Sequence, residues 1–296
     1  MKNKVVYLLL FGLLFGCAEQ QETPYIKSIK EYHAKRIERL KQPDSWLTLV
    51  GLFWLKEGEN TFGTDKSNDI VFPEGTAPKF IGVFTRNDSI VNVKINNDVK
   101  VFHNDSLVTS LILQNDMSGN PTILKHGSLT WYVIKRADKL GIRLKNSESK
   151  LLKEFSDIEM FPIDPKWRVE AEFLEYDKPK IVEIPTAIGT VEKGTAFGKL
   201  KFKIDGKDFT LEPLGEKNEL FLVFADLTNG EETYGAGRFL AVDKPDSTGK
   251  IFIDFNKAYN PPCVFTKYAT CPLPTKENML KIKVTAGEKN FHSAYH

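Results

Sequence analysis

The chain has 296 residues, of which 41% are hydrophobic and 11% aromatic, and its 41 basic and 39 acidic residues give a formal net charge of +2. This composition is typical of a packed globular protein and argues against disorder. The basic residues are interspersed with acidic ones, whereas nucleic-acid binding rewards clustered Lys and Arg, so we expect no nucleic-acid partner.

The first 16 residues have the pattern of a secretory signal. Two lysines precede an apolar stretch at residues 5–15, which is too short for a transmembrane helix because such a helix needs about 20 apolar residues. The stretch ends in Leu14-Phe15-Gly16-Cys17, which resembles a bacterial lipobox, where the cysteine becomes the new N-terminus and carries lipid. The alternative is an ordinary signal peptide with an incidental cysteine, but Cys17 stands where a lipobox requires it.

This pattern predicts an exported lipoprotein of the cell envelope, whose membrane partner is reached through lipid on Cys17. Such an anchor places the domain in the cell envelope, where it faces either the periplasm or the cell surface. Removing residues 1–16 leaves 39 basic residues against 39 acidic ones, so the mature chain is neutral. We expect a signal peptide at 1–16, a polar tether at 17–23 and a single β-rich domain at 24–296.

A helix is expected directly after the tether. Thr23 is a suitable N-cap and Pro24 suits the first turn. Apolar residues recur on one face up to Leu40, and Pro43 ends the pattern. The following segment, residues 46–55, is almost wholly apolar and contains Trp46 and Trp54, so we expect it to be buried or to form part of a pocket wall.

Beyond Gly58 the sequence favours strands. Several segments alternate apolar and polar residues, and Asp205-Gly206 is a strong hairpin turn signal. The expected strands are residues 80–86, 90–95, 99–102, 129–135, 142–144, 169–173, 200–204, 209–211, 220–225, 233–240, 251–255 and 280–284. Short strands without a fixed repeat predict a mainly β protein, an antiparallel sandwich or barrel-like fold with an N-terminal helix.

Standard catalytic and cofactor motifs are missing from the sequence: it has no GxSxG, HExxH, P-loop or glycine-rich dinucleotide turn. The five histidines are dispersed. His292 and His296 have a spacing of four, which suits a metal on a helix, but they lie in a terminal segment without a further ligand nearby. We therefore predict neither a metal nor a cofactor.

The last third of the chain contains the candidate site. Arg238 follows two glycines and is flanked by apolar residues, a setting in which a guanidinium usually binds a carboxylate or phosphate. A proline-rich loop after it carries many hydrogen-bonding groups, as loops that build sites often do. The ligand-binding candidates are Arg238, Asp254, Asn256, Tyr259, Asn260, Tyr268 and Glu288.

The same loop carries a family resemblance. Residues 254–263 (DFNKAYNPPC) and 268–274 (YATCPLP) resemble the family known as domain of unknown function 1684. Further matching motifs lie at 45–55, 161–169, 233–240 and 286–288. The resemblance spans nearly the whole mature chain, but the family has no established activity. Its members include exported lipoproteins, in agreement with the N-terminal signal.

With Cys17 acylated, two cysteines are left. A bridge between Cys263 and Cys271 closes a loop of about nine residues, and the chain-entropy estimate for such a loop is about 2.5 kcal/mol. An oxidising compartment favours this bridge. The alternatives are two buried thiols, or a nucleophilic Cys263 activated by Arg238 or a nearby lysine.

Two hypotheses about function follow. The first is a lipoprotein that binds a small ligand or serves a structural role. The second is an envelope hydrolase that uses Asp254 or Glu288 as acid or base, with Arg238 holding an anionic group. The structural alternative for these residues is an ion pair of Arg238 with Asp254 or Glu288, and polar loop residues that bond the backbone. If these side chains converge on an open pocket, a binding or catalytic site is favoured. If they are buried and hydrogen-bonded to one another, a structural motif is favoured.

Overall fold

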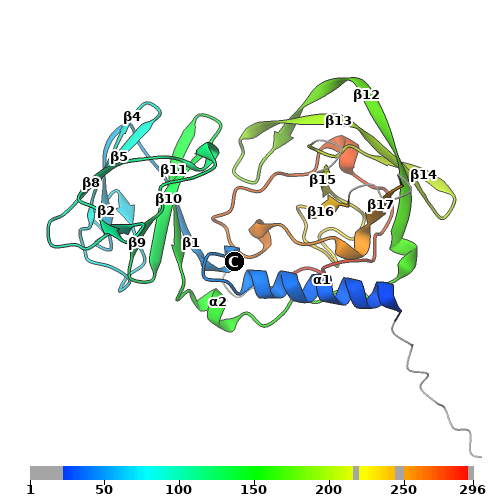
Figure 1. The fold of residues 1–296 in the computed structure, drawn as a ribbon, viewed down its shortest axis with the longest axis horizontal. Helices are drawn as coiled ribbons and strands as arrows, with labels where there is room; N and C mark the ends of the chain where they lie inside the picture. The colour runs from blue at the N-terminus through cyan, green and yellow to red at the C-terminus, as the bar shows by residue number, and fades with distance from the viewer. Residues whose placement is uncertain (1–22, 216–219, 244–249, 293–296) are drawn as a thin grey trace, which may run out of the picture.

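The computed structural model describes residues 23–215, 220–243 and 250–292. The protein is mainly β, with several antiparallel sheets in a sandwich-like arrangement and one long helix near the N-terminus, as the sequence predicts. Two β lobes lie side by side, and the helix runs along the second of them (Figure 1). The predicted signal peptide and Cys17 lie outside the described residues.

Helix α1 (Pro24–Leu40) begins and ends where the sequence predicts. The Thr23 side chain accepts a hydrogen bond from the Ile26 N–H at 3.3 Å, which satisfies one of the free donors of the first turn. Only Ile29 and Leu40 of this helix are fully buried, so its attachment depends on few apolar contacts. No helix among residues 23–215, 220–243 and 250–292 is long and apolar enough to cross a membrane.

The first lobe contains two sheets that pack face to face. One has the order β1-β11-β10-β9-β6-β7, with bounds β1 Leu49–Trp54, β6 Phe102–His103, β7 Ser106–Leu107, β9 Leu124–His126, β10 Leu129–Arg136 and β11 Lys139–Asn146. The other has the order β3-β2-β4-β5-β8, with bounds β2 Gly58–Gly63, β3 Ile70–Val71, β4 Gly82–Asn87, β5 Ile90–Ile95 and β8 Ser110–Leu113. An aromatic core lies between them, in which Phe62 stacks on Phe84 with ring centroids 4.1 Å apart.

Successive side chains of β10 and β11 point to opposite faces of the sheet, so only every second one enters this core. Trp131 and Ile142 point into it. Their neighbours Tyr132 and Arg143 pair across the two strands and therefore lie on the opposite face of the sheet. That face looks toward the second lobe (Figure 1).

The second lobe is built on a long hairpin. Its four-stranded sheet has the order β14-β13-β12-β17, with bounds β12 Arg168–Pro185, β13 Val191–Ile204, β14 Lys207–Leu211 and β17 Ile251–Asp254. A two-stranded sheet of β15 (Leu220–Phe224) and β16 (Arg238–Val242) packs against the same core. The predicted Asp205-Gly206 turn joins β13 to β14, and both residues have positive φ, 49° and 76°, as a type I′ hairpin turn requires.

Short helices fill the connections. They are α2 Lys150–Glu154 and the 3₁₀ helices η1 Trp46–Thr48, η2 Asp116–Ser118, η3 Pro165–Trp167, η4 Phe255–Lys257, η5 Pro262–Val264 and η6 Lys276–Asn278. The two lobes have separate hydrophobic clusters. The single domain expected at 24–296 stays a prediction.

Three strand predictions are wrong. The strand expected at 233–240 begins only at Arg238, because the carbonyl of Thr228 accepts three backbone N–H groups and holds the preceding residues in a tight loop. The segment 280–284 is irregular, and 99–102 contributes a strand only from Phe102. In 99–102 and 280–284 burial alternates along the segment without a continuous ladder, so a period of two in the sequence does not distinguish these two segments from strands.

Candidate functional site

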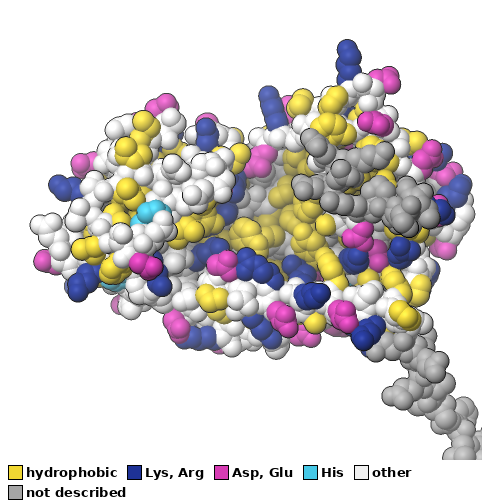
Figure 2. Space-filling model, in the orientation of Figure 1, with side chains coloured by type: hydrophobic (Ala, Val, Ile, Leu, Met, Phe, Trp, Pro, Cys, Tyr) yellow, Lys and Arg dark blue, Asp and Glu magenta, His cyan; other side chains and the backbone are white. Residues whose placement is uncertain are grey.

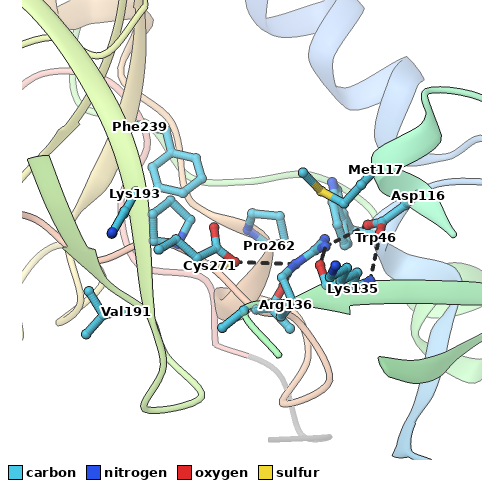
Figure 3. A pocket seen from close by; sticks show the side chains of 14 residues that line it. Trp46, Asp116, Met117, Lys135, Arg136, Val191, Lys193, Phe239, Pro262 and Cys271 are labelled. Carbon is cyan, nitrogen blue, oxygen red and sulfur yellow. Dashed lines mark hydrogen bonds and ion pairs between the residues drawn. The ribbon is translucent and has the colours of Figure 1, made fainter. Parts of the chain in front are cut away.

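A cleft of about 810 Å³ opens between the two lobes (Figure 3). The first lobe contributes Trp46, Asp116, Met117, Lys135, Arg136 and Ala137 to its lining. The second contributes the hairpin residues Val191, Glu192 and Lys193, together with Phe239, Pro262, Thr270, Cys271 and Pro272. In the space-filling view, hydrophobic side chains gather in the hollow between the lobes (Figure 2).

Arg136 lies at the first-lobe side of this cleft, at the end of β10. Its guanidinium pairs with Asp116, with 2.7 Å between Nη1 and Oδ2. Asp116 belongs to helix η2 and is held in place by β10, because its other carboxylate oxygen accepts the backbone N–H of Lys135 at 2.9 Å. The Nε of Arg136 donates to the Thr270 hydroxyl at 3.0 Å and lies 3.7 Å from a carboxylate oxygen of Glu192. One arginine thus links both lobes across the cleft.

Arg143 lies beneath the same cleft and is only 3% exposed. Its Nη2 donates to the Thr270 hydroxyl at 3.2 Å, and its guanidinium lies 5.2 Å from the centre of the Trp46 ring. Its Nε has no hydrogen-bond partner in the part of the chain that the structure describes. Among the described residues, no carboxylate forms an ion pair with it. A buried charge without a counter-ion is costly, and a buried polar atom without a partner in a native structure calls for a specific explanation.

Cys263 and Cys271 lie next to each other at the edge of the cleft. The N–H of Cys263 donates to the Sγ of Cys271 at 3.1 Å, and the N–H of Cys271 donates to the Sγ of Cys263 at 3.4 Å. Both are free, buried thiols in the structure, without the predicted bridge. Their mutual hydrogen bond lowers the pKa of Cys263, and the same bond together with burial raises the pKa of Cys271.

Arg238, the first residue predicted for a ligand site, is fully buried and paired within the second lobe. Its partner is Asp226, with 2.7 Å between Nη2 and Oδ2, and both side chains are 0% exposed. The structural alternative, an ion pair of Arg238 with Asp254 or Glu288, is therefore wrong: the ion pair exists, but its acid is Asp226. The guanidinium also donates to the carbonyls of Val284, at 2.9 Å, and Ala286. Burial lowers the pKa of Arg238, and Asp226 opposes this change.

Asp254 and Asn256 lie under helix α1. The Tyr25 hydroxyl donates to Asp254 Oδ1 at 2.9 Å, and Asn256 Nδ2 donates to the same hydroxyl at 2.9 Å. Asp254 also caps η4 by accepting the Asn256 N–H at 3.1 Å. Burial, followed by the charge of Asp254, raises the pKa of Tyr25. These two residues attach the helix to the loop and face no open cleft.

Tyr259, Asn260 and Glu288 form a second contact with the same helix. Arg36 pairs with Glu288, and its guanidinium lies 4.4 Å from the centre of the Tyr259 ring. The Asn260 N–H donates to Glu288 Oε2 at 2.7 Å. Glu288 is 1% exposed, at the edge of a groove beside α1 that also contains His33. Burial lowers the pKa of His33.

Tyr268 packs against a small apolar cluster near the cleft. None of the seven ligand candidates chosen from the sequence lines the cleft; of the residues singled out there, Trp46 and Cys271 do. Arg136 and Arg143 were missed. Arg143 stands in Gly141-Ile142-Arg143-Leu144, so the criterion that selected Arg238, an arginine flanked by apolar residues, would have found it too.

Comparisons with known proteins identify a family for part of the chain. Residues 153–289 match the family described as "Protein of unknown function (DUF1684)". The matched range holds the second lobe, and the resemblance expected at 45–55 falls outside it. The chain is also similar to the uncharacterized protein from gene locus rrnAC0354 of Haloarcula marismortui, whose solution NMR structure is 33% identical, covers 46% of this chain and 78% of its own, and has a TM-score of 0.39. No curated protein matches.

Proposed function

We propose that this chain, whose residues 153–289 belong to that family of proteins of unknown function, is a membrane-anchored lipoprotein of the cell envelope that binds a small ligand between its lobes. The observation that carries the proposal is the cleft of about 810 Å³. Small-molecule sites are typically clefts of about 300–1,000 Å³ with apolar walls and a few polar groups. The apolar side chains of Trp46, Phe239 and Pro262 and the charged side chain of Arg136 line the cleft and meet this description.

The cleft is tested by closing it. Val191 is 55% exposed at the cleft, and Ile181 is 62% exposed on the partner strand of the same hairpin, outside the cleft. A panel of small envelope metabolites is screened by thermal shift on the mature protein, since a ligand at 100 times its Kd adds about 2.7 kcal/mol to the free energy of unfolding. We expect Val191→Trp to abolish the shift and Ile181→Trp to keep it. A panel that shifts nothing, or a shift that survives Val191→Trp, contradicts the proposal.

The anchor rests on the lipobox at residues 14–17. We expect the mature protein to begin at Cys17, to carry lipid there and to sediment with membranes, since dual acylation gives stable anchoring. Cys17→Ser should leave the signal peptide uncut by the lipoprotein pathway and remove the lipid, which intact mass and membrane fractionation measure. Mature protein that retains Met1, or unchanged processing of the variant, excludes the anchor.

A disulfide between Cys263 and Cys271 belongs to the same proposal. The close contact of the two sulfur-bearing residues supports it, as does the oxidising compartment that export implies. We expect no alkylated thiol in the exported protein under non-reducing conditions. Two alkylated thiols in its mass spectrum rule the bridge out.

The hydrolase alternative draws no support from the geometry. Asp254 is bonded to Tyr25 and Asn256, Glu288 is paired with Arg36, and Arg238 is paired with Asp226. The three groups do not share an open pocket in which an acid, a base and an anion holder act on one substrate.

A further inference from the structure

The floor of the cleft is the place where two guanidinium groups meet. Arg136 Nε and Arg143 Nη2 both donate to the hydroxyl oxygen of Thr270, at 3.0 Å and 3.2 Å. The two arginines come from neighbouring strands of the first lobe, and Thr270 comes from the C-terminal loop of the second. Two like charges held at one oxygen repel each other; Asp116 offsets the charge of Arg136, whereas Arg143 has no ion pair among the described residues.

The charges around this floor are unequal. Lys135, Arg136 and Lys193 line the cleft together with Asp116 and Glu192, and Arg143 beneath adds a fourth cation. Both acidic residues lie near Arg136. Within the described part of the chain, Lys135, Lys193 and Arg143 form no ion pair. The cleft therefore carries more positive than negative charge, which attracts an anion to it.

The Thr270 hydroxyl can form one further hydrogen bond, as a donor. A threonine hydroxyl has one proton to donate and two lone pairs to accept with, and the two arginines occupy the lone pairs. The hydroxyl donates to no described atom, although Thr270 is only 8% exposed and lines the cleft. Its free proton needs an acceptor, and the two guanidiniums behind it favour an acceptor that is negatively charged.

We propose that Thr270, Arg136 and Arg143 form an anion subsite that binds the carboxylate or phosphate group of the ligand. This inference rests on the proposed function and specifies its ligand as an acid with an apolar body. The acid group accepts hydrogen bonds from the Thr270 hydroxyl and from an Arg136 N–H. Arg143 lies beneath and supplies charge, while Trp46 and Phe239 contact the apolar body. The cost of burying Arg143 without a counter-ion is removed when the anion binds.

The test uses inorganic phosphate and acetate as probes, titrated into the mature protein at constant ionic strength, because screening weakens such contacts. We expect Thr270→Val, which keeps the shape but removes the hydroxyl, to weaken binding about tenfold, the effect of losing a hydrogen bond to a charged group. Arg143→Met should weaken it at least as much. Thr85→Val, a half-buried threonine on β4 outside the cleft, is the matched control and should bind like the unchanged protein.

The two proposals fail in different ways. Binding of either probe that depends on Thr270 supports the subsite, and the tighter probe names the acid group. Absence of binding by both probes, or equal binding by Thr270→Val, overturns the subsite. If a metabolite still binds, is blocked by Val191→Trp and is unaffected by Thr270→Val, the ligand cleft stands and only the anion subsite falls.

Discussion

Arg238→Met is expected to lower the free energy of unfolding by about 3–5 kcal/mol, the range for breaking a buried ion pair by removing one partner. The variant leaves the Asp226 carboxylate buried at 0% exposure without its cation. It also removes the donors to the carbonyls of Val284 and Ala286. A domain is stable by only about 5–15 kcal/mol, so this single change removes a large part of the total.

Urea unfolding measures this effect, and Arg143→Met is its matched control. Both arginines are buried and both become the same apolar side chain, but Arg143 has no ion pair among the described residues. Replacing Arg143 leaves no carboxylate without its cation and removes a buried charge that has no counter-ion. We therefore expect the free energy of unfolding of Arg143→Met to be unchanged or increased. The structural role of Arg238 is contradicted if the two variants lose equal stability.

Local patterns in the sequence identify the α1 boundaries and most strands. The Thr23 cap, the apolar face of the helix and the Asp205-Gly206 turn act over a few residues, so their signals are present in the local sequence. The pairing of sheets is not local. Strands β1 and β11 are neighbours although about ninety residues separate them, and no period in the sequence specifies that contact.

The candidate site shows the same limit. Arg143 and Arg238 are both flanked by apolar residues in the sequence. Yet Arg238 pairs with Asp226, whereas Arg143 donates to the Thr270 hydroxyl. Which acid reaches which arginine depends on how distant segments pack. The polar groups of the loop at 254–260, which the sequence offers as ligand-binding candidates, form hydrogen bonds within the protein. The partner of this loop is helix α1, more than 200 residues away, and no local pattern in the sequence specifies a contact at that separation.

That helix provides the second large effect. Arg36→Met is expected to lower the free energy of unfolding by about 3 kcal/mol or more, because Glu288 stays 1% exposed and loses its cation. The variant also loses a hydrogen bond of 3.0 Å to the Asn260 carbonyl and the contact with the Tyr259 ring. Most of the stability of a helix in a protein comes from tertiary packing, and α1 buries only Ile29 and Leu40, so we expect it to depend on these contacts to stay folded.

Hydrogen exchange separates detachment of α1 from general destabilisation. In Arg36→Met the α1 amides should exchange faster than in the unchanged protein, whereas those of β12 and β13 should not. The reason is that the helix opens without the rest of the lobe. Arg39→Met is the matched control on the same helix. Its ion pair with Asp44 is more than 60% exposed on both sides, and such pairs contribute at most about 1 kcal/mol. If α1 keeps its protection in Arg36→Met, or loses it equally in Arg39→Met, the contact between Arg36 and Glu288 does not hold the helix. If only Arg36→Met frees it, the polar residues at 254–260 and Glu288 attach α1 to the second lobe, and the cleft at Thr270 is left as the site open to a ligand.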